Sequence, residues 1–157
     1  MGQKVLNMRK IVVTDTTKNK VKAWLDKLST PNKKMDNMPI CPFIGKYRNR
    51  IHIAQTTKPE FLANNFAHMK DVFRFEAVVA FGFWMSYDKM DKMITALNKK
   101  LAHKDTICLM MHPDGDESVL PVDYQFELPI LIIQRLSTLN KARKQLEKTK
   151  YYKHYKY

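Results

Sequence analysis

Ala77-Val78-Val79-Ala80-Phe81-Gly82-Phe83-Trp84 is a continuous apolar run in the middle of the chain. A run of this length that is rich in β-branched and aromatic residues is typical of a central strand buried on both faces. Thr106-Ile107-Cys108-Leu109-Met110-Met111 has the same character and is ended by His112-Pro113. We therefore expect a sheet built around these two segments.

Two weaker segments have ambiguous patterns. Ile51-His52-Ile53-Ala54 alternates apolar and polar residues as a strand does, although it also fits the end of a preceding helix. Ile11-Val12-Val13, within Lys4 to Thr14, places three β-branched residues in a row, which disfavours a helix. This N-terminal segment predicts either a short first strand or an extended arm.

Apolar residues at helical spacing predict four longer helices. The first covers residues 17–28, and the second starts at the capping-box spacing Thr57 to Glu60. A third begins at Ser86, and Pro129 opens a last helix that carries Arg135 in its middle. The stripes are Val21, Trp24, Leu25 and Leu28; Leu62, Phe66, Met69 and Phe73; Met90, Met93, Ile94, Leu97 and Leu101; and Ile132, Ile133, Leu136, Leu139 and Leu146.

The order of these elements indicates a single α+β domain over residues 1–147. The 157 residues of the chain suffice for one buried core and are too few for two. We expect a small mixed or antiparallel sheet with helices mainly on one face, most simply in a ferredoxin-like arrangement. Residues 29–38 are polar and aperiodic and predict a surface loop, and residues 148–157 form a basic, aromatic C-terminal tail.

The composition gives an excess of positive charge. Lys and Arg number 28 against 15 Asp and Glu, a net charge of +13, which favours polyanionic partners. The competing interpretation is a solvated surface, because most of the excess is scattered Lys. The apolar runs are far shorter than the roughly 20 residues of a membrane helix, and no signal region opens the chain, so we expect a cytoplasmic protein without a membrane partner.

Cys41 is the first candidate for chemistry. Pro42 is a typical first residue of a helix, so that Cys41 would lie at the N-cap, near unpaired N–H groups. Lys46, Arg48 and Arg50 follow on the same short helix and would also favour the thiolate. The alternative is a free thiol that packs as a small hydrophobe, which is also our expectation for Cys108.

His112 and Arg135 complete the predicted site. His112 ends a buried strand, where it can act as a base or bind an anion, unless it is only a turn residue. Arg135 needs an anionic partner or ligand if it is buried, and otherwise extends into solvent. With Cys41 and His112 as catalytic candidates and Arg48, Arg50 and Arg135 as anion-binding residues, the sequence predicts a pocket for a small anionic ligand.

The sequence leaves open whether that pocket catalyses a reaction. Ile44 stands where a resolving Cys would be, which excludes a dithiol mechanism through neighbouring residues. We expect no cofactor. Asp114, Asp116 and Glu117 lack the spacing of a calcium loop, and no pair of Cys or His has zinc-site spacing, so we expect no metal.

The C-terminal tail supports a different function. Its interleaved Lys and Tyr residues have the chemistry to neutralise phosphates and stack on bases, although they also fit a solvated terminus. With the basic helix faces, the tail predicts a non-enzymatic nucleic-acid-binding protein as the alternative. An adaptor with an exposed apolar helix face for a protein partner is a third possibility. The tail residues are Lys150, Tyr151, Tyr152, Lys153, Tyr155 and Lys156.

Short motifs resemble a bacterial family known as a domain of unknown function. Its members carry a Trp in an N-terminal helix, a Leu-Cys-Pro-Phe motif, a strand-helix-strand unit ending in His-Pro, and a Pro-opened terminal helix with Leu-Leu-Arg-Glu. Trp24, Ile40 to Phe43, Met111 to Pro113 and Pro129 to Arg135 stand in the corresponding order here. The resemblance spans roughly residues 20–147 and implies the same fold and a grouping of Cys41, His112 and Arg135.

This chain departs from the family at two places. Leu136 replaces the Glu that follows the Arg, and Gln125-Phe126-Glu127-Leu128 replaces a polar Asn-Arg-Ser-Pro-Tyr segment. A family site built on those polar groups would be incomplete here. The family has no assigned reaction, so the resemblance implies no activity.

Overall fold

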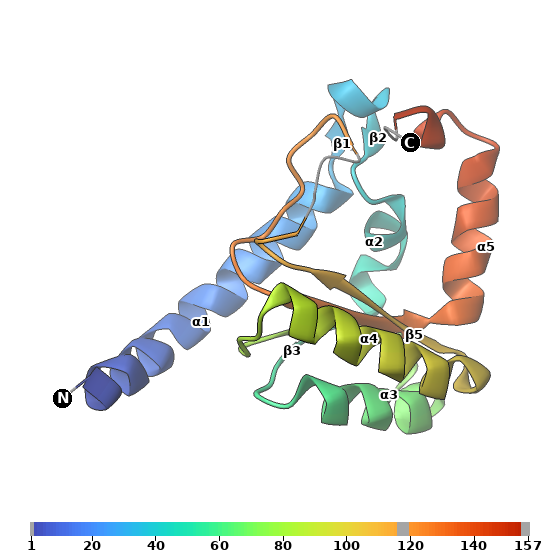
Figure 1. The fold of residues 1–157 in the computed structure, drawn as a ribbon. Helices are drawn as coiled ribbons and strands as arrows, with labels where there is room; N and C mark the ends of the chain where they lie inside the picture. The colour runs from blue at the N-terminus through green and yellow to red at the C-terminus, as the bar shows by residue number, and fades with distance from the viewer. Residues whose placement is uncertain (1, 116–119, 155–157) are drawn as a thin grey trace.

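The structure, a computed structural model, describes residues 2–115 and 120–154, with side chains from residue 16 onward except Phe73. This part of the chain forms five α-helices and six strands, and Figure 1 shows their arrangement as a ribbon. The helices are α1 (Gly2–Ser29), α2 (Pro42–Tyr47), α3 (Pro59–Phe73), α4 (Tyr87–Leu101) and α5 (Leu136–Glu147), and the 3-10 helices are η1 (Lys33–Met35), η2 (Arg48–Arg50), η3 (Ala102–Lys104) and η4 (Tyr151–His154). The strands are β1 (Pro31–Asn32), β2 (Met38–Pro39), β3 (Ile51–Gln55), β4 (Ala77–Phe81), β5 (Thr106–Met111) and β6 (Ile130–Arg135).

The main sheet has four strands in the order β3-β4-β6-β5. β3 and β4 are parallel, and β6 is antiparallel to both of its neighbours, β4 and β5. The predicted α+β class, with a small mixed sheet, is confirmed. From β3 to β6, the strands of the main sheet and the helices between them follow one another as β-α-β-α-β-β. A ferredoxin-like unit has β-α-β-β-α-β, so that predicted arrangement is not the one formed.

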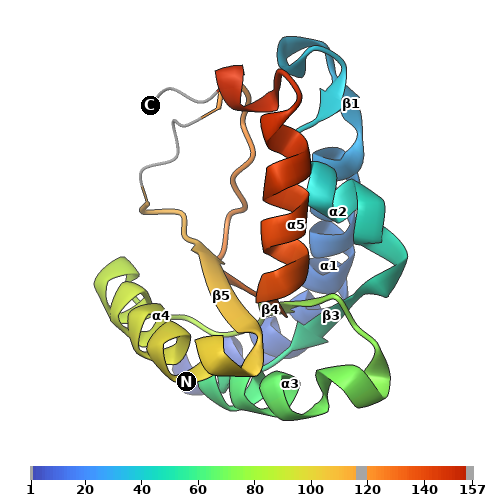
Figure 2. The same cartoon turned by 90° about the vertical axis from the view of Figure 1, so that its right-hand side faces the viewer.

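Helices cover both faces of this sheet, not mainly one as predicted. α3 and α4 pack on one face against Val78, Ala80 and Leu131, while α1, α2 and α5 lie on the other, against Val79 and Ile130. Figures 1 and 2 show the two layers from directions at right angles. The alternation of strand side chains explains the two cores, because successive residues of β4 point to opposite faces. The predicted central position of β4 is confirmed by its five buried residues.

The segment after Pro129 is the clearest correction to the sequence analysis. Residues Ile130–Arg135 form β6, which lies between β4 and β5, and the last helix begins only at Leu136. Short apolar runs satisfy helical and strand patterns alike, and here the two available strand partners decide in favour of the strand. Arg135 therefore ends a strand and precedes a helix, and the prediction that it lies in mid-helix is wrong.

The N-terminal segment also differs from the prediction. α1 runs without interruption from Gly2 to Ser29, so Ile11-Val12-Val13 is helical and forms neither a strand nor an extended arm. The C-terminal half of α1 contains the helix predicted over residues 17–28, and it packs as expected, with Val21, Trp24 and Leu25 buried. The β-branched residues show only a weak propensity, which the surrounding helix overrides.

Two further local predictions need correction. Residues 29–38 are not only a surface loop, because β1 and β2 form a small hairpin around η1, whose Met35 is fully buried. The helix predicted from Thr57 exists as α3, but its N-cap is Lys58 without a side-chain cap, and Thr56 accepts a hydrogen bond from the N–H of Lys58. The capping box is therefore not formed.

The segment before β6 packs on α1. The indole N–H of Trp24 donates to the carbonyl of Tyr124 at 2.9 Å, and its ring lies 5.5 Å from that of Phe126. Lys20 pairs with Glu127 at 3.0 Å.

Among the helices over residues 2–115 and 120–154, none is long and apolar enough to cross a membrane.

Candidate nucleic-acid interface

Cys41 lies at the N-cap of α2, as predicted, with its N–H bonded to the carbonyl of Leu28 at 2.9 Å. Burial raises the pKa of its thiol, and the weaker opposing effect comes from the backbone N–H groups of Ile44 and Phe43. Burial also raises the pKa of Cys108, to about 12. The expected stabilisation of a Cys41 thiolate is therefore outweighed by desolvation.

The basic residues that follow Cys41 are engaged elsewhere. Arg48 pairs with Asp26 at 3.1 Å, and Arg50 pairs with the buried Glu76 at 2.9 Å. Lys46 donates to the side chain of Gln145 on α5 at 3.4 Å. The two arginines predicted to bind an anionic ligand thus already have carboxylate partners within the protein.

His112 follows β5 and is buried, with only 2% of its surface exposed. The backbone N–H of Asp114 donates to Nδ1 at 3.0 Å, so Nε2 carries the hydrogen and donates to the carbonyl of Met85 at 2.8 Å. Both ring nitrogens are therefore satisfied within the neutral imidazole. This geometry matches the turn interpretation of His112 better than that of a general base.

Arg135 connects the end of β6 to the end of α3. Its guanidinium donates to the carbonyl of Lys70 at 2.8 Å, to the carbonyl of Phe75 at 3.1 Å and to Asp71 at 2.7 Å. The bond from Arg135 lowers the pKa of the Asp71 carboxyl. The Lys70 carbonyl also accepts from the N–H of Arg74 at 2.8 Å, so Arg135 adds a second hydrogen bond at the C-terminal end of α3.

The structure does not bring the three predicted site residues together. Arg135 pairs with Thr106 at one end of β5, while His112 directly follows Met111 at the other end. Six residues of strand separate these ends by about 20 Å. Cys41 packs with α2 in the core on the opposite face from α4. A single small anion could not contact both His112 and Arg135.

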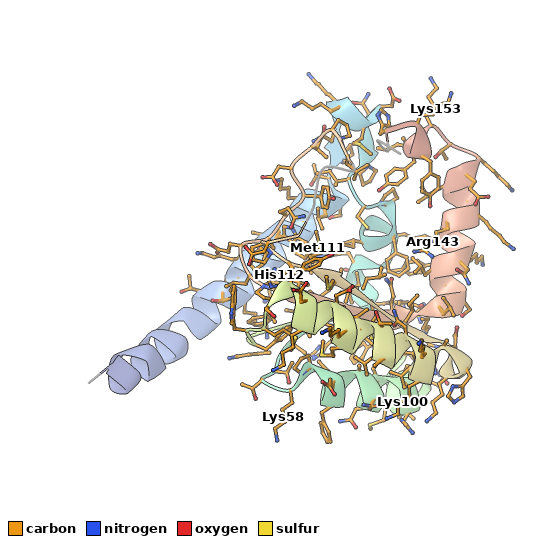
Figure 3. All side chains as sticks on the ribbon, in the orientation of Figure 1. Lys58, Lys100, Met111, His112, Arg143 and Lys153 are labelled. Carbon is orange, nitrogen blue, oxygen red and sulfur yellow. The ribbon has the colours of Figure 1, made fainter. Side chains whose placement is uncertain are left out.

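The C-terminal part of the chain presents a different arrangement, which we name the α5–η4 basic surface. Its cationic side chains are exposed, and within the described residues none of them makes a hydrogen bond or ion pair with a side chain. Glu147 is the only acidic residue between 136 and 153. Figure 3 shows Arg143 on α5 and Lys153 beyond it on the same side of the molecule. The surface consists of Lys141, Arg143, Lys144, Lys148, Lys150 and Lys153.

The segment after α5 is anchored rather than simply solvated. Tyr151 is 5% exposed, and its ring packs edge-on against Tyr152, with centroids 5.4 Å apart. His154 pairs with Asp36 at 2.9 Å. The predicted base-stacking role does not suit the buried Tyr151, while Lys150 and Lys153 are exposed as predicted. Tyr155 and Lys156 lie outside the described residues.

Sequence reasoning missed Lys141, Arg143, Lys144 and Lys148 as named site residues, although it placed them on the outer face of the last helix. Their spacing in the sequence resembles that of any solvated helix. What distinguishes them is that none forms an ion pair within the described residues, although Glu147 lies on the same helix, and only the fold reveals this. Among the residues with described side chains, no cluster of three His, Cys, Asp or Glu is placed to hold a metal ion.

An exposed apolar face on α3 corresponds to the adaptor possibility. Phe61 is 65% exposed and Val72 is 74% exposed, both on the side of α3 away from the sheet. Such a patch is the kind of surface that a protein partner covers.

Comparison of the chain with protein-family models, with curated proteins and with solved structures finds no match. The resemblance of its short motifs to the bacterial domain of unknown function therefore contributes nothing further to a functional assignment.

Proposed function

We propose that this protein is a non-enzymatic nucleic-acid-binding protein that contacts the phosphate backbone through the α5–η4 basic surface. The observation that supports the proposal is the pairing pattern of the cations. Arg48, Arg50 and Arg135 are bound to carboxylates, whereas the six cations of this surface have no such partner within the described residues. Cations without a carboxylate partner can neutralise phosphates and so release the counterions condensed on the nucleic acid, which favours a polyanionic ligand.

The dimensions of the surface suit several consecutive phosphates. α5 has 12 residues and is therefore about 18 Å long. Duplex DNA covers that length with roughly five base pairs, at 3.4 Å per phosphate of each strand. Lys46 lies beside Gln145 and extends the positive charge toward α2.

The chemistry of the surface favours binding without sequence preference. Five of its six cations are Lys, which acts as a flexible point charge, and only Arg143 carries the planar fork that reads base edges. Contacts to phosphate position a protein on nucleic acid but carry no sequence information. We therefore expect similar affinities for oligonucleotides of different sequence.

A charge-reversal experiment tests the proposal. Lys141, Lys144 and Lys148 are replaced by Glu, and a matched control replaces three exposed lysines on α4, namely Lys92, Lys99 and Lys100. Both variants change the net charge equally, so only the location of the charge differs. Fluorescence anisotropy with labelled oligonucleotides of about 20 nucleotides, single-stranded and duplex, measures the affinity at about 50 mM salt.

We expect the α5 variant to lose at least about tenfold in affinity, and the α4 variant to lose much less, because several phosphate contacts are removed only in the first. Circular dichroism and thermal unfolding check that both variants are folded. Equal losses in the two variants would show that net charge alone governs binding. The absence of binding by the unmodified protein at low salt would end the proposal.

A further inference from the structure

A second feature of the molecule is a cavity between α4, the outer edge of β5 and the segment that precedes β6. Its volume is about 370 Å³, which lies in the range of roughly 300 to 1,000 Å³ typical of small-molecule sites. α4 contributes Tyr87, Asp91 and Asn98, and residues 124–125 close the opposite side. His112 follows β5, the strand that lines the cavity with residues 108–111.

The charge of the cavity is opposite to that of the rest of the protein. Asp91 supplies a carboxylate, and among the described lining residues there is no Lys or Arg, although the chain carries a net charge of +13. Tyr87, Asp91 and Ile94 fall at i, i+4 and i+7, so they lie on one stripe of α4 that faces the cavity. The lysines of α4 lie outside this stripe and do not line the cavity. The Asp91 carboxylate forms no hydrogen bond or ion pair within the described residues.

Aromatic rings stand on two sides of the same cavity. Tyr87 lines it from α4 and Tyr124 from the opposite segment. Tyr87 is held by an edge-on contact with the ring of His112, with centroids 5.8 Å apart and planes at 89°. Because both nitrogens of His112 are satisfied as the neutral imidazole, this residue brings no positive charge to the lining.

We propose that this cavity binds a small organic ammonium cation. Asp91 is its counter-ion, and the electron-rich faces of the Tyr87 and Tyr124 rings provide cation–π contacts, the combination that recognises alkylammonium groups. An anionic ligand would find no cation to neutralise it. The proposal is independent of the α5–η4 basic surface, which lies against the other face of the sheet.

Choline and its neutral carbon isostere, 3,3-dimethylbutan-1-ol, test the proposal because they share shape and differ in charge. Isothermal titration calorimetry measures the binding of each to the full-length protein. We expect choline to bind at least about tenfold more tightly than the isostere, since a cation–π contact and a carboxylate both favour the charge. Equal affinities, or no binding of choline up to about 50 mM, would overturn the proposal.

Two matched variants locate the site. Asp91→Asn removes the carboxylate charge with little change in shape, and Asp88→Asn does the same on α4 outside the cavity lining. We expect Asp91→Asn to lower choline affinity several-fold and to leave the binding of the isostere unchanged, whereas Asp88→Asn leaves both unchanged. An unaltered choline affinity in Asp91→Asn would refute the assigned site. Oligonucleotide binding by Asp91→Asn should equal that of the unmodified protein, which keeps this test separate from that of the basic surface.

Discussion

The hydroxyl of Tyr151 donates a hydrogen bond of 2.6 Å to the carbonyl oxygen of Ile40. This bond joins the segment after α5 to the residue that precedes Cys41, so that two parts of the chain distant in sequence share one core. Lys150 and Lys153 flank the buried tyrosine and are therefore held in place on the surface of the domain. A fixed cation loses less conformational entropy on binding than one on a free terminus.

Replacing Tyr151 with Phe should lower the free energy of unfolding by about 1 kcal/mol, because the buried carbonyl of Ile40 loses its donor. Urea unfolding followed by circular dichroism measures the change. Tyr47→Phe is the control, since the Tyr47 hydroxyl forms no hydrogen bond within the described residues. If the two substitutions had the same effect, the bond to Ile40 would not contribute to stability.

Asp71→Asn should alter the pH dependence of stability. The bond from Arg135 lowers the folded-state pKa of Asp71, so the carboxylate contributes stability that is present above the unfolded pKa of about 3.9 and is lost as the pH falls through the folded pKa. The unmodified protein should be more stable than Asp71→Asn at pH 6, and the difference should vanish in strong acid. Thermal unfolding across this range measures it.

The same substitution in an Arg135→Gln background provides the control for this coupling. Without the guanidinium the Asp71 carboxyl loses its donor, so Asp71→Asn should have a much smaller pH-dependent effect, because only the weaker attraction of Lys70 remains. An undiminished effect in that background would show that Arg135 is not the main cause of the lowered Asp71 pKa.

Asn98 protects the outer edge of β5. Its side chain accepts from the N–H of Cys108 at 2.7 Å and donates to the carbonyl of the same residue at 3.1 Å, in the place of a neighbouring strand. Asn98→Ala should cost about 2 kcal/mol of stability and promote self-association through the exposed edge. Chemical unfolding and size-exclusion chromatography measure the two effects.

Asn64→Ala is the matched control for that experiment, because within the described residues the Asn64 side chain forms one hydrogen bond, an exposed one to the Glu60 carbonyl on the same helix. It should change stability by much less and leave the protein in its original oligomeric state. A comparable cost in both variants would contradict the role of Asn98 at the edge.

Both thiols should react slowly in the folded protein. Burial raises the pKa of Cys41 and of Cys108, so little thiolate is present at neutral pH. Alkylation of the single-cysteine variants Cys41→Ala and Cys108→Ala, followed by mass spectrometry, should be at least about tenfold slower in the folded than in the urea-unfolded state. Appreciable reaction of Cys41 below pH 7 would instead support thiol chemistry at the start of α2.

The local patterns in the sequence predicted most elements, and the errors have identifiable causes. The buried strands β4 and β5, the N-cap at Ser86 and the position of Cys41 before α2 follow from composition and capping rules. The apolar residues of β6 fit the helical period as well as the strand period, so the sequence predicts a helix there. Only its pairing with β4 and β5, separated from it in the sequence, decides the matter.

The candidate sites were less predictable than the fold. Arg135 and His112 looked like functional residues because they are polar groups near strand ends, but each is satisfied by backbone atoms from a distant element. Conversely, the lysines of α5 looked like an ordinary solvated face. Their significance depends on which carboxylates lie nearby, and that is a property of tertiary structure.

The salt dependence of oligonucleotide binding reports how many phosphates the α5–η4 basic surface contacts. The logarithm of the association constant is measured against the logarithm of salt concentration for the unmodified protein and for Lys144→Gln, with Lys99→Gln on α4 as the control. If Lys144 contacts a phosphate, its loss should make the slope shallower by about 1, and Lys99→Gln should leave the slope unchanged. Identical slopes for Lys144→Gln and the unmodified protein would contradict binding through the α5–η4 basic surface.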